Sequence, residues 1–190
     1  MEGWSKGKYK MLLRILHPLG EKWRWTLNLD NHFYTSLPKT DRTIKLTSGM
    51  LMGSWMGSHL TNDDLVKEAR LEEDYTAEIS FEGVRDDQNI IEFTLIPKID
   101  AAVVWGKLTL TILADSHIPL VEYYYDEDMA LARTIRFTNI QQLGGRQRPA
   151  VLRVVPADKP EEYTEFVYEE LSLNVALKDS LFSLSSLKKR

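Results

Sequence analysis

Hydrophobic and polar residues alternate one by one along several segments of the chain. The clearest alternation covers residues 22–29, 77–82, 91–95 and 107–112. Successive side chains of a β-strand point to opposite faces, so each of these segments would carry one apolar face and one polar face. Strands of a parallel sheet are buried on both faces and are apolar throughout, so the alternation is typical of antiparallel strands. The pattern predicts a mainly antiparallel β protein.

Less regular segments extend this prediction over most of the chain. Further strands are expected at residues 8–16, 32–36, 42–47, 118–125, 132–139, 150–155 and 163–175. Turn-forming residues mark reversals at Asp30-Asn31, at residues 83–89, at Asp126-Glu127-Asp128 and at Gly144-Gly145. Many short strands separated by turns favour a meander that curls into a barrel or a half-barrel.

Helix signals are few. Thr61 followed by Asp64 resembles a capping box in which Asp stands in place of the usual Glu or Gln. Asp179 precedes Ser180, Leu181 and Phe182, where we expect a single closing turn. The 190 residues contain no internal repeat and no evident domain boundary, so residues 1–190 are expected to form one domain.

Composition and charge exclude several classes of protein. The chain has no cysteine, which excludes disulfides, thiolate metal sites and cysteine nucleophiles. Its net charge is −4, so no basic surface for nucleic acid is expected. No apolar stretch approaches the roughly 20 residues that a membrane-spanning helix needs. Residues 1–8 lack the apolar segment of a signal peptide.

Motifs that carry catalysis or bind metals are absent from the sequence. The four histidines, His17, His32, His59 and His117, lie far apart and in no zinc-binding pattern, so we expect them to be exposed or hydrogen-bonded loop residues. The sequence has no P-loop, no dinucleotide-binding glycine motif and no serine-hydrolase elbow. We therefore expect no enzymatic activity, no cofactor and no metal site.

Residues 49–60 form an unusual segment that holds three of the six methionines, together with Trp55 and several glycines. Methionine is flexible and suits surfaces that adapt to an irregular apolar partner, and glycine lets the backbone bend. Two interpretations stay open. The segment is a mobile apolar flap at a lipid or peptide site, or it is a loop that plugs the end of the β-structure and joins its core.

The large residues of the apolar faces allow the same two interpretations. They fill the interior of a tightly closed sheet, or they line the concave groove of an open one. Few helices are predicted that could cover an open sheet, which indicates a closed barrel, a missing helical part, or a surface that a ligand fills. The candidate ligand-binding residues are Trp23, Trp25, Leu27, Phe33, Met50, Met52, Trp55, Met56, Ile79, Phe81, Phe93, Leu95, Leu110 and Tyr123.

Several motifs resemble one known family. The most specific is residues 56–65, MGSHLTNDDL, and it is accompanied by WTLNL at residues 25–29, FYTSLP at residues 33–38, PLVEYY at residues 119–124 and LF at residues 181–182. Together they resemble the outer-membrane lipoprotein-sorting protein family of the LolA/LolB-like superfamily. The resemblance extends from about residue 9 to residue 187.

This resemblance implies a fold and a function. The fold would be a strongly curved antiparallel sheet that forms an incomplete, half-open barrel, with a few short helices over a hydrophobic cavity. The protein would be a periplasmic carrier for the acyl chains of a lipid or a lipoprotein. Its partners would include an inner-membrane transporter or an outer-membrane acceptor. Family members usually begin with a signal peptide, a helix and further strands, so we expect this chain to lack a leader and the first elements.

An alternative to the carrier stays open. The domain could be an interaction module with a filled core that partners a membrane transporter of the cell envelope. Neither interpretation requires a covalent step.

Overall fold

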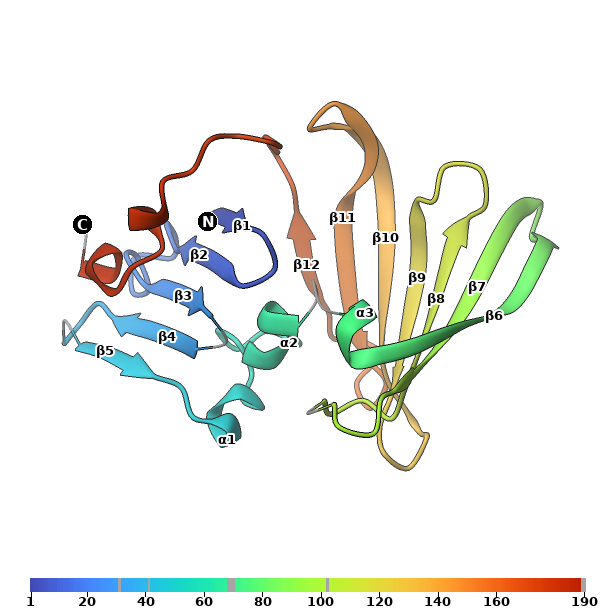
Figure 1. Ribbon diagram of the computed structural model, residues 1–190, viewed down its shortest axis with the longest axis horizontal. Coiled ribbons are helices and arrows are strands. Elements are labelled where there is room, and N and C mark those ends of the chain that lie inside the picture. The colour runs from blue at the N-terminus through green and yellow to red at the C-terminus, as the bar shows by residue number, and fades with distance from the viewer. Residues whose placement is uncertain (31, 41, 68–70, 102, 189–190) are drawn as a thin grey trace. The chain divides into compact units, whose positions relative to one another are not determined.

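The computed structural model describes residues 1–30, 32–40, 42–67, 71–101 and 103–188. The chain divides into two compact units (Figure 1). Unit 1 comprises residues 1–56, 61–70 and 175–190, and unit 2 comprises residues 57–60 and 71–174. Each unit is built on its own antiparallel β-sheet.

Unit 1 contains a five-stranded meander, because each strand pairs with the next one in sequence. Its strands are β1 (Glu2–Lys6), β2 (Lys10–Arg14), β3 (Trp25–Leu29), β4 (His32–Leu37) and β5 (Arg42–Lys45). Its short helices are α1 (Ser48–Leu51), α2 (Asn62–Lys67) and the 3-10 helices η2 (Asp179–Leu181) and η3 (Leu184–Lys188). Strand β1 was not expected from the sequence.

The main buried cluster of unit 1 lies on one face of this sheet. Leu12 pairs with Leu27 across β2 and β3, so the two side chains point to the same face. They form a buried cluster with Trp25, with Phe182 and with Leu187 of η3. The last two residues come from the C-terminal end of the chain, so the helical turns η2 and η3 supply the cover for the apolar face of β2 and β3. The closing turn expected at Asp179 is therefore present.

The capping box predicted at the start of α2 is confirmed. The backbone N–H of Thr61 donates to the carboxylate of Asp64 at 2.7 Å, and the backbone N–H of Asp64 donates to the hydroxyl of Thr61 at 3.1 Å. The two side chains thus satisfy amide groups that the first turn of a helix leaves without partners.

Unit 2 contains a seven-stranded antiparallel sheet with the strand order β12-β11-β10-β9-β8-β7-β6. Helix α3 (Leu71–Asp74) leads into it. Its strands are β6 (Tyr75–Arg85), β7 (Gln88–Pro97), β8 (Lys107–Leu113), β9 (Pro119–Tyr125), β10 (Leu131–Leu143), β11 (Arg146–Pro156) and β12 (Thr164–Val167). The expected class, mainly β and antiparallel with a few short helices and no closed barrel, is confirmed. The strands lie in two sheets, whereas one was expected.

Turns between the strands of unit 2 follow the predicted chemistry with one correction. The connector expected at residues 83–89 is only Asp86-Asp87, both with positive φ, as the tightest hairpin turns require. Gly144 and Gly145 also have positive φ and close the β10–β11 hairpin as predicted. The turn expected at Asp30-Asn31 falls partly outside the described residues.

One irregularity changes which side chains share a face. Ile79 pairs with Phe93, but Phe81 pairs with Glu92, so two residues of β6 lie opposite one residue of β7. This is a β-bulge at Ser80, and residues beyond it point to the opposite face from the one that the alternation predicts.

Candidate functional site

One face of the seven-stranded sheet carries two rows of cross-strand neighbours. In the first row, Leu95 pairs with Leu108, Leu108 with Tyr124 and Tyr124 with Arg133. In the second row the paired residues are, in order across the sheet, Ile79, Phe93, Leu110, Glu122, Ile135 and Val154. Directly paired residues of an antiparallel sheet point to the same side. We call this side the inner face.

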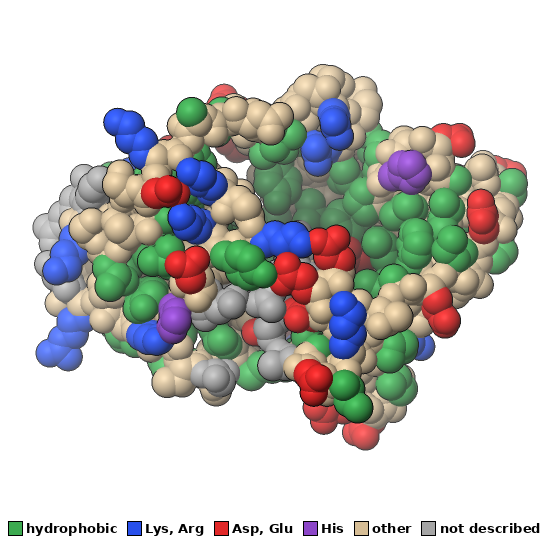
Figure 2. Space-filling view, viewed as in Figure 1, with side chains coloured by type: hydrophobic (Ala, Val, Ile, Leu, Met, Phe, Trp, Pro, Cys, Tyr) green, Lys and Arg blue, Asp and Glu red, His purple; other side chains and the backbone are tan. Residues whose placement is uncertain are grey.

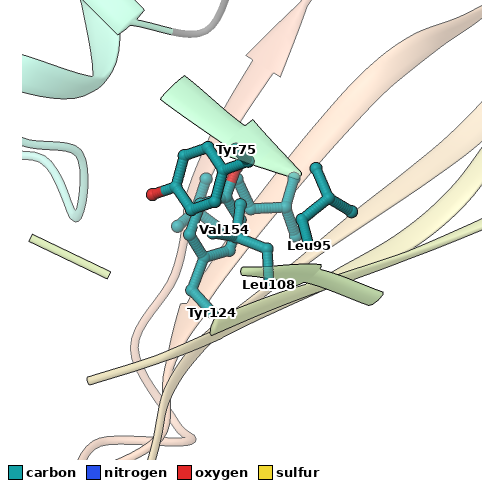
Figure 3. Close-up of a cluster of buried hydrophobic side chains, with 6 residues drawn as sticks. Tyr75, Leu95, Leu108, Tyr124 and Val154 are labelled. Carbon is teal, nitrogen blue, oxygen red and sulfur yellow. The ribbon is translucent and has the colours of Figure 1, made fainter. Parts of the chain in front are cut away.

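The inner face holds the core of unit 2. The buried cluster consists of Tyr75, Leu95, Leu108, Tyr124, Ile135 and Val154, and Figure 3 shows how these side chains gather over the sheet. Leu108 is 2% exposed and Val154 is 1% exposed, so the middle of the sheet is closely packed. Other apolar residues of the same face, including Phe93, Leu110, Phe137 and Leu152, are only partly buried.

Cover is weakest at the β6 edge. Ile79 lies on the inner face beside Phe93 and is 56% exposed. Figure 2 shows a hollow over β9, β10 and β11 with hydrophobic side chains on its floor, and further hydrophobic side chains over β7 and β8. The inner face therefore runs from a closed core to an apolar surface that water reaches.

A polar cluster interrupts this apolar face. Arg133 is 4% exposed, and its guanidinium carbon lies 4.2 Å from the ring centroid of Tyr124 and 4.6 Å from that of Trp105. The two rings meet edge to face at 5.3 Å. The hydroxyl of Tyr124 donates to the carboxylate of Glu122 at 2.7 Å. A cation, two aromatic rings and a carboxylate are thus gathered at one place on the inner face.

His59 lies beside this cluster and forms hydrogen bonds at the start of β12. Its backbone N–H donates to the hydroxyl of Thr164 at 3.1 Å, and its ring Nδ1 lies 2.9 Å from the same oxygen. Its Nε2 lies 3.2 Å from a carboxylate oxygen of Glu162. The hydrogen bond with His59, together with the nearby charge of Lys159, lowers the pKa of Glu162 below its ordinary value. Arg133 reaches the backbone carbonyl of His59 at 3.5 Å.

The four histidines lie as the sequence analysis predicts. His17, His32 and His117 are exposed, and His59 is a hydrogen-bonded loop residue, as expected. Among the residues whose placement is described, no three side chains of His, Cys, Asp or Glu gather as metal ligands would. Within the same residues, no helix is both long enough and apolar enough to cross a membrane.

Four of the predicted ligand-binding residues are core residues of unit 1. Trp25 and Leu27 are 4% and 0% exposed and lie under the C-terminal turns. Phe33 is 2% exposed and pairs with Asn28, which places it on the opposite face of the same sheet. Trp55 is 6% exposed.

The other predicted residues of unit 1 lie nearer its surface. Met50, Met52 and Met56 are 45%, 45% and 36% exposed. Trp23 is half-buried, and the guanidinium of Arg14 lies 5.4 Å from its ring centroid. In unit 1, then, the predicted residues are divided between the interior and the surface.

The predicted residues of unit 2 divide between the two faces of one sheet. Ile79, Phe93, Leu95 and Leu110 share the inner face. The bulge turns Phe81 to the other face, where the guanidinium of Arg85 lies 4.3 Å from its ring centroid.

Tyr123 also lies on that other face, because it pairs with Thr109 and Thr134. Sequence analysis did not single out Arg133, Glu122 or Tyr124. The signal for Arg133 was present, because it alternates in phase with Ile135 and Phe137.

Residues 7–189 match a protein-family model described as an uncharacterized protein. The chain belongs to this family. No curated protein matches this chain in sequence.

Three solved structures share the fold of this family member. A domain assigned to outer-membrane lipoprotein sorting, from Vibrio parahaemolyticus, is 21% identical with a TM-score of 0.81, covering 95% of this chain and 77% of that one. A DUF1329 family protein from Desulfovibrio piger is 20% identical with a TM-score of 0.83, covering 94% and 76%. A LolA superfamily protein from Nitrosomonas europaea is 22% identical with a TM-score of 0.80, covering 97% and 80%. The LolA-like fold implied by the sequence motifs is confirmed.

Proposed function

We propose that the protein is a carrier or receptor that holds an acyl chain on the inner face of its seven-stranded sheet. The observation that carries this proposal is the partial cover of that face. Ile79 is 56% exposed although it shares the face and the row of Phe93 and Leu110. A large apolar side chain exposed at the end of an apolar row marks a surface that another apolar group can complete.

The energetics of such a site are favourable. Burial of each methylene group contributes about 0.8 kcal/mol. An acyl chain that buries several methylenes against Phe93, Leu110 and Ile79 gains enough to offset the loss of freedom on binding. Binding and release need neither a covalent step nor a cofactor, so the proposal does not include an enzymatic activity.

The place of this function in the cell is part of the proposal. One protein of the same fold is assigned to outer-membrane lipoprotein sorting and another to the LolA superfamily. We infer from this likeness that the protein acts in the periplasm, in lipoprotein sorting or lipid transport. An inner-membrane transporter would load it and an outer-membrane acceptor would receive its ligand.

A second candidate function is an interaction module that partners an envelope transporter and binds no lipid. The close packing around Leu108 and Val154 favours it, because a filled core leaves less room for a chain. Native mass spectrometry of the purified protein separates the two functions. Co-purified lipid supports the carrier, and a protein of unliganded mass that also takes up no added lipid supports the module.

A matched pair of variants tests where the chain binds. Ile79 on β6 and Val167 on β12 are 56% and 59% exposed, and both lie on edge strands of the same sheet. Only Ile79 is on the inner face, because Val167 pairs with Val151, a residue of the other face. We expect Ile79→Asp to lower the affinity for a fatty acid about tenfold, because it places a charge beside the chain. Competition with a fluorescent fatty acid measures this affinity.

Val167→Asp is the control, and it should leave this affinity unchanged. Both substitutions are at exposed positions, so each should alter stability by no more than about 0.5 kcal/mol. Equal affinity of the two variants would place the chain elsewhere, and no saturable binding by the unmodified protein would refute the carrier.

We also propose that residues 1–190 form one LolA-like domain. A single cooperative transition in urea, recorded alike by circular dichroism and by tryptophan fluorescence, is the expected result. Two separate transitions would contradict it.

A further inference from the structure

The motif at residues 56–65, MGSHLTNDDL, contributes four residues to the cover of the inner face. Residues 57–60 belong to unit 2, and Leu60 packs against the buried cluster. Its neighbour His59 is hydrogen-bonded to Thr164, which pairs with Val154 and so continues the second row of the inner face onto β12. Residues 57–60 therefore lie at the β12 end of this face, and we call them the strap.

Polar contacts of His59 hold the strap in place. Its backbone N–H donates to the hydroxyl of Thr164 at 3.1 Å, and its ring Nδ1 lies 2.9 Å from the same oxygen. Its ring Nε2 lies 3.2 Å from the carboxylate of Glu162, and its backbone carbonyl accepts a hydrogen bond from Arg133 at 3.5 Å. The side chain of His59 is 23% exposed. Hydrogen bonds that water reaches are exchanged at a small net cost, so this attachment can open and close.

The chain beside the strap has the geometry of a hinge. Met56 and Gly57 have φ angles of 56° and 73°, and a Cβ at Gly57 would meet no atom within 4 Å. This point of the chain is therefore sharply bent and not packed. Behind it, Ser54 forms a β-bridge with Thr61, which joins the two ends of the loop. A loop with joined ends can move at its tip while its base stays closed.

The rest of the inner face explains why the strap would have to move. Leu108 and Val154 are 2% and 1% exposed, so the middle of the face is closed, whereas its β6 end is open at Ile79. A chain that buries more than a few methylenes must therefore displace part of the cover. No residue of the strap is in a strand, so the strap can yield without breaking the pairing of the sheet.

We propose that the strap is a gate, and that an acyl chain reaches the buried part of the inner face only when His59 releases Thr164 and Leu60 swings away from the cluster. This inference rests on the proposed function and deepens it, because it names how access to that site is regulated. The closed state is held by the polar contacts of His59 and by the apolar contact of Leu60. A chain that replaces Leu60 on the cluster favours the open state.

A disulfide across this attachment tests the gate. The sequence contains no cysteine, so His59→Cys combined with Thr164→Cys creates a single pair. The hydrogen bond from the backbone of His59 to the side chain of Thr164 places the two backbones within reach of a disulfide. The reduced pair leaves the strap free and the oxidised pair locks it. Stopped-flow fluorescence with dansyl-undecanoate measures entry and release. We expect oxidation to slow both rates at least about tenfold, because a locked gate blocks the path of the chain.

A second disulfide is the matched control. Arg153→Cys combined with Glu165→Cys joins β11 to β12 on the other face, where these two residues pair directly. It stiffens the same edge of the sheet and does not touch the strap. Its oxidation should leave both rates unchanged.

A single substitution tests the gate in the opposite direction. Thr164→Val keeps the branched shape of the side chain and removes the hydroxyl that His59 contacts. We expect it to speed the entry and release of dansyl-undecanoate about fivefold, the factor that one ordinary hydrogen bond gives. Hydrogen exchange of the His59 amide, measured without ligand, should rise by about the same factor. Thr138→Val, at an exposed position that pairs with Val151 on the other face, should change none of these rates.

The outcomes separate the gate from the function beneath it. If the unmodified protein does not bind dansyl-undecanoate saturably, the proposed function fails and the gate falls with it. If the unmodified protein binds and the locked pair binds as fast as the reduced one, the chain site stands and the gate is overturned. An equal slowing by the control disulfide also overturns it. If the pair does not oxidise, Thr164→Val decides, and unchanged rates in that variant overturn the gate.

Discussion

The two sheets of this protein cover their apolar faces in different ways. In unit 1 the face that bears Trp25 and Leu27 lies under Phe182 and Leu187, and its central side chains are almost fully buried. In unit 2 the middle of the inner face is equally buried, but the face continues to Ile79, which is 56% exposed. One sheet is completed by the chain's own C-terminal turns, and the other is completed only in part.

The two sheets show which structural information an alternating pattern carries. Alternation identifies the residues that need cover, and the same kind of pattern appears in both sheets. The cover itself is tertiary, because in unit 1 it comes from the far end of the chain. The strand of unit 1 that bears Trp25 and Leu27 is therefore core, whereas strands of unit 2 supply the proposed binding face.

The largest effect is expected where the cover of unit 1 is removed. Phe182 is 3% exposed within the core cluster. Phe182→Ala should lower the free energy of unfolding by about 3–5 kcal/mol, because it leaves a cavity over β3. Urea denaturation measures the loss. Leu184→Ala is the control, since Leu184 is 47% exposed, and it should change stability far less. Equal losses would show that the C-terminal turns do not seal this core.

A smaller effect is expected on the inner face of unit 2. Phe93 is only partly buried, so Phe93→Ala should lower the free energy of unfolding by about 1–2 kcal/mol. The same variant should bind acyl chains more weakly, because Phe93 lies beside Ile79 in the proposed site. A stability loss as large as that of Phe182→Ala, with binding unchanged, would mean that Phe93 is ordinary core and would remove the contrast between the sheets.

Much of the fold could be predicted because most strands contain their own signal. Ten of the strands fall at or close to the segments expected from alternation and turn residues, and β12 occupies only the start of residues 163–175. Strand β1 was missed because Trp4 is its only large apolar residue, so period-two alternation is not visible there. Its pairing with β2 supplies what its own sequence lacks.

The faces of the strands were harder to predict than the strands themselves. The bulge at Ser80 has no signal in the sequence, and it moves Phe81 to the opposite face from Ile79. Tyr123, Tyr124 and Tyr125 are consecutive aromatic residues, so alternation cannot tell which of them points inward. The register selects Tyr124.

Arg133 was missed because a charged residue in a strand is ordinarily interpreted as solvent-exposed. Its phase along β10 placed it with Ile135 and Phe137, and that phase was the better guide. A charged residue that keeps the period of an apolar face is a candidate for a buried functional group.

The smallest effect concerns the ion pairs that hold the C-terminal turns against the sheet of unit 1. Asp179, at the start of η2, accepts hydrogen bonds from Lys10 at 2.9 Å and from Lys6 at 3.1 Å. These bonds and the charges of the two lysines lower the pKa of Asp179 below its ordinary value of 3.8. A carboxyl with a lowered pKa in the folded state stabilises that state above its unfolded pKa, and the contribution is lost as the pH falls through the folded value.

The difference in Tm between the unmodified protein and Asp179→Asn should therefore be full at neutral pH, begin to shrink near pH 4, and disappear only below the lowered pKa of the folded state. The three groups are at the surface, so added salt should reduce the difference at neutral pH by screening their charges. Lys10→Met should reproduce the effect, and combining it with Asp179→Asn should add little. A difference that persists unchanged at low pH would mean that the charge of Asp179 does not fasten the C-terminal turns, and the burial of Phe182 and Leu187 would then hold the cover on unit 1 by itself.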